Sequence, residues 1–454
     1  MAISQTRRGT VVIRPQTESS GAGSSYTLPF ASGDMPPGDD AVLLEADITL
    51  PEPALEIFER DAVRGSLGYT IDPVEGSKYG GTISLKFPLK GWTNTAAASI
   101  AANPFISNEM SIISQILGGV LYQAGSPPLG YGYQASAVAA GSDSNTVKIE
   151  SAKSIDAYKV GAGLILEDAS ADYRIGFIQN AIENDGGGSS DHTVELSAPL
   201  SETGSDFATP NTGTNTFGCV TGYMSNDAPT ANTILWRSAE TNTQLLCESA
   251  VLTSVSLSLD PRANLVAECV FACRRIVADV ATPGSLSYAY DATTDRPVLP
   301  PAMGNNGARL VYSTNGTTAT AFDVESLSIE MTQEIKPQLS HGAAEGCAGV
   351  IVTSRSVSMS VTGLLGNASP WDASGDGVPP LALSNATPPR VMLQLGSAPG
   401  NMVGFFMPRA LQSALPKVED RDSVLAVTYD LKPGNYTSDT ATDAGNSSFR
   451  MAIG

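Results

Sequence analysis

Residues 325–366 read ESLSIEMTQEIKPQLSHGAAEGCAGVIVTSRSVSMSVTGLLG. Apolar and polar residues alternate from Leu327 to Met331 and again from Val357 to Val361. A period of two is typical of a β-strand with one buried face and one solvated face. The segment between the two runs is polar and rich in Glu and Gly, which favours a loop. The stretch therefore predicts two strands joined by a polar loop.

The same plan occurs earlier in the chain, at residues 46–91, ADITLPEPALEIFERDAVRGSLGYTIDPVEGSKYGGTISLKFPLKG. A second pair of segments, 233–267 and 392–426, aligns at one constant offset of 159 residues, which places Leu252 against Leu411. Two alternating β segments can also resemble each other by chance. We interpret the shared plan and the constant offset together as an internal duplication. A repeat changes the architecture that the sequence predicts.

Duplication divides the chain into two copies of one β domain. We predict the first copy at 41–272, interrupted by a small inserted β module at 134–225, and the second at 320–454. Residues 1–40 are rich in Gly, Ser and Pro without periodicity, and we expect an arm that orders only against neighbouring chains. Residues 273–319 are expected to be a linker.

The inserted module and one helix complete the predicted elements. Short strands are expected around Val147–Ile149, Ile175–Ile178 and Val194–Leu196, separated by Gly-rich turns. Between residues 105 and 119 the apolar residues change to helical spacing, and two glycines then follow. We predict one short helix there.

Composition favours the same fold class. Only 16% of the 454 residues are charged, and 44 Gly and 29 Pro are spread along the chain. Such a balance suits many short strands joined by turns. The prediction is an all-β protein, β-rich with one or two short helices.

The net charge is −20, from 26 basic and 46 acidic residues. This charge opposes specific nucleic-acid binding, which depends on Lys and Arg contacts to phosphates. It suits a conduit through which a polyanion slides, but on charge alone the preferred interpretation is an abundant protein that must stay soluble.

Catalytic motifs are absent from the sequence. The two histidines, His192 and His341, belong to no H-E-x-x-H motif, and there is neither a phosphate-binding loop nor a G-x-S-x-G elbow. Cys269 and Cys273 fall in an alternating run, where a strand would hold them too far apart to share a metal ion. We expect no enzyme activity, no cofactor and no metal site. No apolar run approaches the roughly 18 residues of a membrane span, so no membrane partner is expected.

The blocks at 46–91 and 353–363 and the run GSAPGNMVGFFMPRALQSALPKVEDRDSVLAVTYDL at 396–431 together resemble the major tail tube proteins of siphophages, a group of bacteriophages. The resemblance implies a duplicated β-sandwich or split-barrel domain whose inner sheets join those of neighbours into a closed β-barrel. Most members form rings of six. Two fused copies imply a homo-oligomer of three chains per ring with pseudo-sixfold symmetry; a hexameric ring is the alternative.

The resemblance further implies a virion structural protein, assembled in the host cytoplasm, whose stacked rings form the tail tube for DNA ejection. Tail-tip and terminator proteins would be its partners, and DNA would pass transiently without specific binding. A loop at 51–67, and less securely one at 332–347, would contact the adjacent ring. The candidate contact residues are Leu55, Glu56, Ile57, Phe58, Glu59, Arg60 and Asp61. A surface helical turn packed on its own domain is the alternative for 51–67.

Two further functions remain open from the sequence. The chain suits a tail-tip or baseplate ring of the same fold. It also suits a carbohydrate-binding or adhesive β-repeat surface protein, with the module at 134–225 as the binding part.

Overall fold

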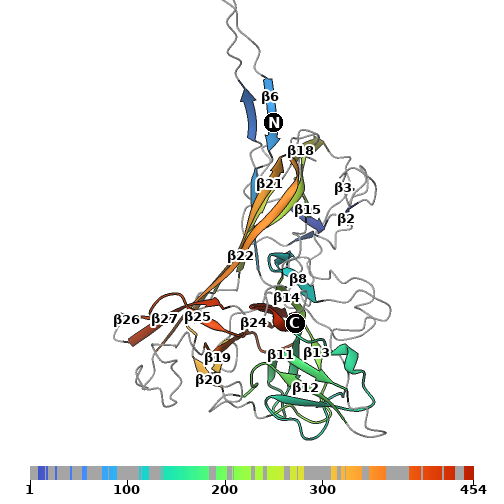
Figure 1. The fold of residues 1–454 in the computed structure, drawn as a ribbon, viewed down its shortest axis with the longest axis vertical. Coiled ribbons are helices and arrows are strands. Elements are labelled where there is room, and N and C mark those ends of the chain that lie inside the picture. The colour runs from blue at the N-terminus through green and yellow to red at the C-terminus, as the bar shows by residue number, and fades with distance from the viewer. Residues whose placement is uncertain are drawn as a thin grey trace, which may run out of the picture.

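The protein is described by a computed structural model, shown in Figure 1. The residues that it describes are 9–15, 17–18, 26–27, 41–42, 54–58, 74–79, 81–88, 112–113, 115–121, 134, 136–183, 191–201, 207, 209–225, 231–238, 243–259, 266–273, 275–280, 308–313, 319–322, 324–339, 347–364, 388–399, 402–421, 424–434 and 444–454. Most of them lie in antiparallel β-sheets, and none of them belongs to a helix of seven or more residues. The expected all-β fold class is confirmed.

Twelve strands form the largest sheet, which runs diagonally through the molecule in Figure 1. They are β1 (Gly9–Pro15), β4 (Ala41–Val42), β7 (Thr82–Pro88), β15 (Ala231–Ser238), β16 (Thr243–Leu259), β17 (Val266–Ala272), β18 (Arg275–Val280), β21 (Ser326–Leu339), β22 (Cys347–Leu364), β25 (Ala410–Gln412), β26 (Lys417–Arg421) and β27 (Val424–Pro433).

Strand β16 belongs to two parts of this sheet. Its first half pairs with β15 and β18, whereas its second half pairs with β17 and β21. Ser249, between the two halves, has a φ of 51°, a left-handed conformation that non-glycine residues seldom adopt. We refer to the second part, in the order β7-β17-β16-β21-β22-β27-β26, as the long sheet.

Two smaller sheets and two ribbons account for the remaining strands. The seven-stranded sheet contains β8 (Gly118–Leu121), β14 (Val220–Met224), β19 (Ala308–Ser313), β20 (Thr320–Phe322), β23 (Arg390–Leu395), β24 (Val403–Met407) and β28 (Arg450–Ile453). The five-stranded sheet contains β9 (Thr146–Ile149), β10 (Gly163–Glu167), β11 (Tyr173–Ile182), β12 (His192–Leu196) and β13 (Phe217–Gly218). The two-stranded ribbons are β2 (Thr17–Glu18) with β3 (Tyr26–Thr27) and β5 (Ala54–Phe58) with β6 (Val74–Tyr79). The 3-10 turns are η3 (Ile155–Ala157) and η4 (Ala444–Asn446).

The same order of strand pairing occurs twice. In the first half of the chain β4-β1-β15-β16-β18 lie side by side, and in the second half β20-β19-β23-β24-β28 do so in the same sequence order. Likewise, the neighbouring strands β7, β17 and β16 of the first half correspond in turn to β22, β27 and the pair β25 and β26 of the second half. The offset of 159 residues found in the sequence carries β15 onto β23 and β17 onto β27.

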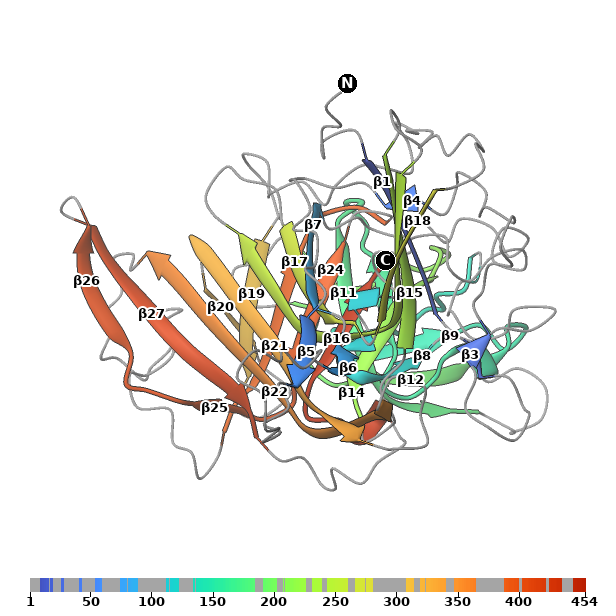
Figure 2. The ribbon, with the colours of Figure 1, turned by 90° about the horizontal axis from the view of Figure 1, so that it is seen from above.

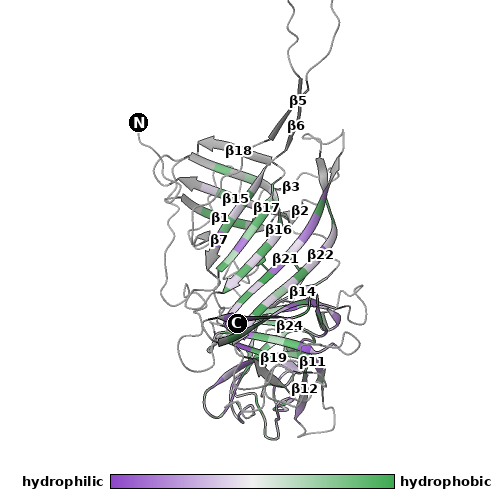
Figure 3. Cartoon of the chain, turned by 90° about the vertical axis from the view of Figure 1, so that its left-hand side faces the viewer, coloured by the Kyte–Doolittle hydropathy of each residue, from purple (hydrophilic) through white to green (hydrophobic). Residues whose placement is uncertain are grey.

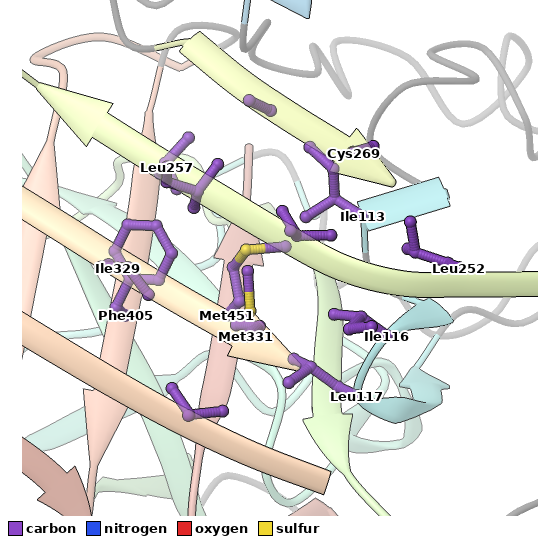
Figure 4. Packing of buried hydrophobic residues seen from close by; sticks show 14 of the residues in the cluster. Ile113, Ile116, Leu117, Leu252, Leu257, Cys269, Ile329, Met331, Phe405 and Met451 are labelled. Carbon is purple, nitrogen blue, oxygen red and sulfur yellow. The ribbon is translucent and has the colours of Figure 1, made fainter. Parts of the chain in front are cut away.

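The long sheet has one apolar and one polar face, as the alternating colours of its strands in Figure 3 show. One row of paired residues runs Leu85, Cys269, Val255, Met331 and Val357, all buried. This face packs against the seven-stranded sheet, and Figure 4 shows Phe405 of β24 and Met451 of β28 beside Ile329 and Met331. The alternation read from the sequence therefore reports burial correctly.

The predicted helix at 105–119 is shorter than expected within the described residues. Helical conformation covers Ile112, Ile113 and Gln115, and the chain enters β8 at Gly118, whose φ is +91°. Ile113 and Ile116 are buried in the core between the sheets, as in Figure 4. Residues 105–111 lie outside the described ranges.

Three predicted boundaries need correction. The expected arm, 1–40, contains β1, which pairs with β15 over seven residues. The expected linker, 273–319, contains two strands that were not predicted, β18 and β19. The module predicted at 134–225 does contain the five-stranded sheet, but β14 at its end belongs to the seven-stranded sheet. Each segment is too short for its periodicity to stand out.

Candidate assembly surfaces

The predicted inter-ring residues begin in a strand. Leu55, Glu56, Ile57 and Phe58 lie in β5, which pairs with β6; for example, Phe58 is opposite Val74. Glu59, Arg60 and Asp61 lie outside the described residues. The alternative of a helical turn is wrong for 54–58. Figure 1 shows the β5–β6 ribbon projecting beyond the rest of the described structure.

The second predicted contact loop, 332–347, is a strand and not a loop at 332–339, whereas residues 340–346 lie outside the described residues and the contact with an adjacent ring stays a prediction. Residues 332–339 continue β21 and pair with β22 as far as Leu339 opposite Cys347. Glu334 and Lys336 are exposed whereas Gln333 is buried, so polar residues lie on both faces of the strand here. Backbone pairing extends this hairpin together with side-chain contacts, such as the hydrogen bond that the Ser354 hydroxyl donates to the Glu334 carboxylate at 3.1 Å.

The polar face of the long sheet is rich in hydroxyl groups. Across five strands, one row of paired residues runs Lys86, Glu268, Ser256, Glu330 and Ser358. All are exposed except Ser256, which is half-buried. The face is therefore hydrophilic and mixed in charge, which favours contact with water over firm binding of any one ligand.

Side-chain hydrogen bonds link neighbouring strands on this face. The hydroxyls of Thr332 and Ser356 are 2.6 Å apart, and those of Thr362 and Thr428 are 2.8 Å apart. The Ser360 hydroxyl donates to a carboxylate oxygen of Asp430 at 2.8 Å. Such pairs contribute about 0.2–1 kcal/mol each. They hold the hydroxyls against the sheet and leave a surface of low relief.

The two ends of the long sheet are unpaired edges within the described part of the chain. One is the side of β7 away from β17, and the other is the side of β25 and β26 away from β27. Figure 2 shows β26 and β27 extending away from the body of the molecule. Leu415, Val418 and Leu425 at this end are 80%, 41% and 47% exposed. An unpaired edge with exposed apolar residues is a surface suited to strand addition.

Stacked aromatic rings attach the inserted module to the seven-stranded sheet. Phe177 of β11 stacks on Phe406 of β24 with ring centroids 5.2 Å apart. Beside them, the Gln394 side chain accepts a hydrogen bond from the Ile175 N–H at 2.9 Å and donates one to the Tyr173 carbonyl at 3.1 Å. The module therefore shares a dry, hydrogen-bonded contact with strands from the second half of the chain.

Two buried arginines, Arg309 and Arg450, and the half-buried Arg390 strengthen this contact. Arg309 Nη2 donates to the Leu200 carbonyl at 2.7 Å, and Arg390 Nη1 donates to the Ser197 carbonyl at 2.5 Å. The Arg450 guanidinium lies 5.4 Å from the centroid of the Phe406 ring. Hydrogen bonds from charged donors are worth about 1.5–3 kcal/mol, so the module is held firmly in one orientation.

Reactive groups are few among the described residues. Burial raises the pKa of the Cys219 and Cys269 thiols, which disfavours the nucleophilic thiolate. A surface cleft is lined by Arg355, Lys432 and Ser448, but Arg355 already donates from Nε to the Gln333 side chain at 2.8 Å. No group of three or more His, Cys, Asp or Glu side chains in the described ranges could hold a metal ion.

No protein-family model and no curated protein sequence matches the chain. Among the described residues there is no helix long and apolar enough to cross a membrane.

Sequence reasoning missed the edge at β25–β26. The segment LQSALPKVEDR has one weak alternation and a proline, and nothing in it marks Val418 as exposed. The sequence contained one signal for this edge, because the constant offset of 159 residues aligns Val418 with Leu259 of β16.

Proposed function

We propose that the chain is a structural subunit of a bacteriophage tail tube, which closes into rings that stack around a channel for DNA. The observation that carries the proposal is the long sheet, because it combines a buried apolar face, a hydroxyl-rich polar face and two edges that no described strand pairs with. A sheet with free edges either aggregates or pairs with defined neighbours, and closure into a barrel removes the edges.

The twice-repeated strand order supports a fused pair of tube domains. Both halves contribute the same five-strand arrangement and the same three-strand arrangement, and β16 pairs with β21 where the halves meet in the long sheet. If each half occupies one position in the ring, three chains make six positions. The resulting ring has threefold symmetry in chains and pseudo-sixfold symmetry in domains.

The polar face of the long sheet would line the channel. Its exposed side chains are serines together with residues of both charges, such as Glu268, Glu330 and Lys86. Specific DNA binding requires clustered Lys and Arg that neutralise phosphates, and this face has no such cluster among the described residues. A duplex would therefore pass with little adhesion.

The β5–β6 ribbon would bridge successive rings. It projects beyond the sheets in Figure 1, and its strands are held only by each other among the described residues. A two-stranded ribbon is marginally stable alone, so a neighbouring ring that buries it would stabilise it. The end rings would meet the tail-tip and terminator proteins.

The proposal is tested by imaging the purified full-length chain and virions that contain it. We expect tubes whose mass per ring equals three chains, and labelling with an antibody against the chain along the whole tail. A mass of six full-length chains per ring would contradict the fused pair. Label restricted to one tip of the tail would instead indicate a tip or baseplate ring.

A further inference from the structure

Two of the buried cysteines are in contact with each other. Cys247 belongs to β16, and Cys273 directly follows the last residue of β17, twenty-six positions later in the chain. Both are free, and they are 1% and 5% exposed. Their side chains are hydrogen-bonded to each other, whereas Cys219 and Cys269 have no such thiol neighbour among the described residues. Cys247 and Cys273 are therefore a pair of thiols in the core.

The pair lies where β16 changes partners. Pairing of β16 with β18 ends at Glu248, one residue after Cys247, and pairing with β17 begins at Val251. Ser249, in the gap between these two stretches, has the left-handed φ of 51°. Cys273 lies in the corresponding gap on the other side, after the last residue of β17 and before the first residue of β18. The two thiols thus flank the same interruption of the sheet.

We propose that Cys247 and Cys273 form a disulfide when the folded chain meets a small peroxide, and that this bond fixes the turn of β16 at Ser249. In the first step a thiolate sulfur attacks one peroxide oxygen, the O–O bond breaks, and a sulfenic acid and water form. In the second step the other thiol attacks this sulfur, the S–O bond breaks, and a second water leaves. The two thiols lose two protons and two electrons, which the peroxide takes up.

The hydrogen bond favours Cys247 as the residue that is oxidised first. The Cys273 thiol donates to the Cys247 sulfur and so lowers the pKa of Cys247. A lower pKa increases the fraction of thiolate, which is the form that attacks an oxidant. Cys273 is then already in contact with the sulfenic acid and can resolve it to a disulfide before further oxidation. Burial makes the first step slow, and the contact makes the second step fast.

The bond would join two parts of the twelve-stranded sheet. The first half of β16 pairs with β15 and β18, and the second half pairs with β17 and β21. A disulfide between Cys247 and Cys273 would hold these parts together at the turn and would also restrict the unfolded chain. Thiols stay reduced in a cytoplasm and are oxidised outside it, so the bond would form after folding. None of these steps depends on ring assembly.

The test treats the folded full-length chain with hydrogen peroxide, digests it without reduction and maps the peptides by mass spectrometry. We expect a peptide pair joined through Cys247 and Cys273. In urea, alkylation should then find three reactive thiols, whereas the reduced chain has five cysteines. The unfolding equilibrium constant should fall by about 100-fold. A thiol reductant should restore it, which separates this effect from methionine oxidation, because methionine sulfoxide needs its own reductases.

Two variants supply the controls. Cys273→Ala removes the second thiol, so dimedone, which captures sulfenic acids, should label Cys247, and peroxide should no longer stabilise the chain. Cys269→Ala is the matched control, because Cys269 is equally buried in the same strand but has no thiol neighbour; this variant should form the bond as wild type does. Circular dichroism shows whether each variant is folded. If either is not, the wild-type peptide map itself compares Cys273 with Cys269.

Three results would overturn the proposal: no link between Cys247 and Cys273 in the folded chain, links through Cys219 or Cys269 that are equally frequent, or a link that forms only in urea. Hydrogen exchange tests the role of the bond separately. Amides around Ser249 should exchange more slowly in the oxidised chain than in the reduced chain. A bond that forms with unchanged exchange there would show that it does not fix the turn.

Discussion

Replacing Phe406 with alanine should lower the free energy of unfolding by about 3–5 kcal/mol and should loosen the inserted module as well as the sheet that carries the substitution. The side chain is 1% exposed and stacks on Phe177 of the module at 5.2 Å. The Arg450 guanidinium, 5.4 Å from the ring centroid, would lose its aromatic contact, which is part of the expected loss.

The neighbouring residue supplies a matched control. Phe405 is also 1% exposed, but it belongs to the core between the two large sheets and stacks on Phe449 at 6.3 Å. Phe405→Ala should cost a similar amount. Only Phe406→Ala should be coupled to Phe177→Ala in a double-mutant cycle, by about 0.5–1.5 kcal/mol, because direct contact is what makes such effects non-additive.

Urea unfolding gives the free energies, and hydrogen exchange resolved by peptide shows which strands open. With Phe406→Ala, exchange should accelerate in β10 and β11 as well as in β24. A loss below about 1 kcal/mol, or unchanged exchange throughout the module, would refute the view that module and sheet unfold together.

Three further outcomes are expected. Gly163→Ala should destabilise the chain by about 1–3 kcal/mol in urea unfolding, because a Cβ at Gly163 would lie 2.4 Å from the Ala452 Cβ; adding Ala452→Gly to Gly163→Ala should recover most of that loss. Burial raises the pKa of Cys219 above its ordinary 9.0 and that of Tyr158 above 10.0. The unfolded chain therefore releases these protons at lower pH than the folded chain, so unfolding free energies measured from pH 7 to 11 should fall above about pH 9, with a slope approaching 1.4 kcal/mol per pH unit per group; a flat profile would contradict this. Cys219, Cys247, Cys269 and Cys273 are free and buried, so alkylation of these four thiols should be slow in the native protein and fast in urea; rapid native labelling at Cys219 would show that the module contact opens.

The sequence predicted the sheets well where alternation is long. The runs around Leu327 and Val357 lie in β21 and β22 with the expected face buried, because a period of two directly reports which side chains meet the core. It predicted poorly where strands are short or where polar residues fill both faces. Residues 332–339 continue β21 by pairing with β22, although Thr332, Gln333 and Glu334 interrupt the alternation of apolar and polar residues.

The candidate surfaces divide in the same way. The segment containing Leu55 was predicted as a contact loop and not as a strand, because its pairing with β6 depends on residues some twenty positions away. The edge containing Val418 could not be identified, because exposure at an edge depends on which strand is missing beside it. The sequence alone shows which residues are apolar, but it does not show which of them a neighbouring strand covers.

Within the described ranges the inserted module occurs in the first half only, and it contacts strands of the second half through Phe406 and Arg309. In a ring of such chains, the inner wall would repeat with every half, whereas the module would recur half as often. The inner wall and the outer surface would therefore repeat at different intervals. A protein that binds the outer surface would find one module per chain, while DNA in the channel would meet a wall in which the two halves are alike.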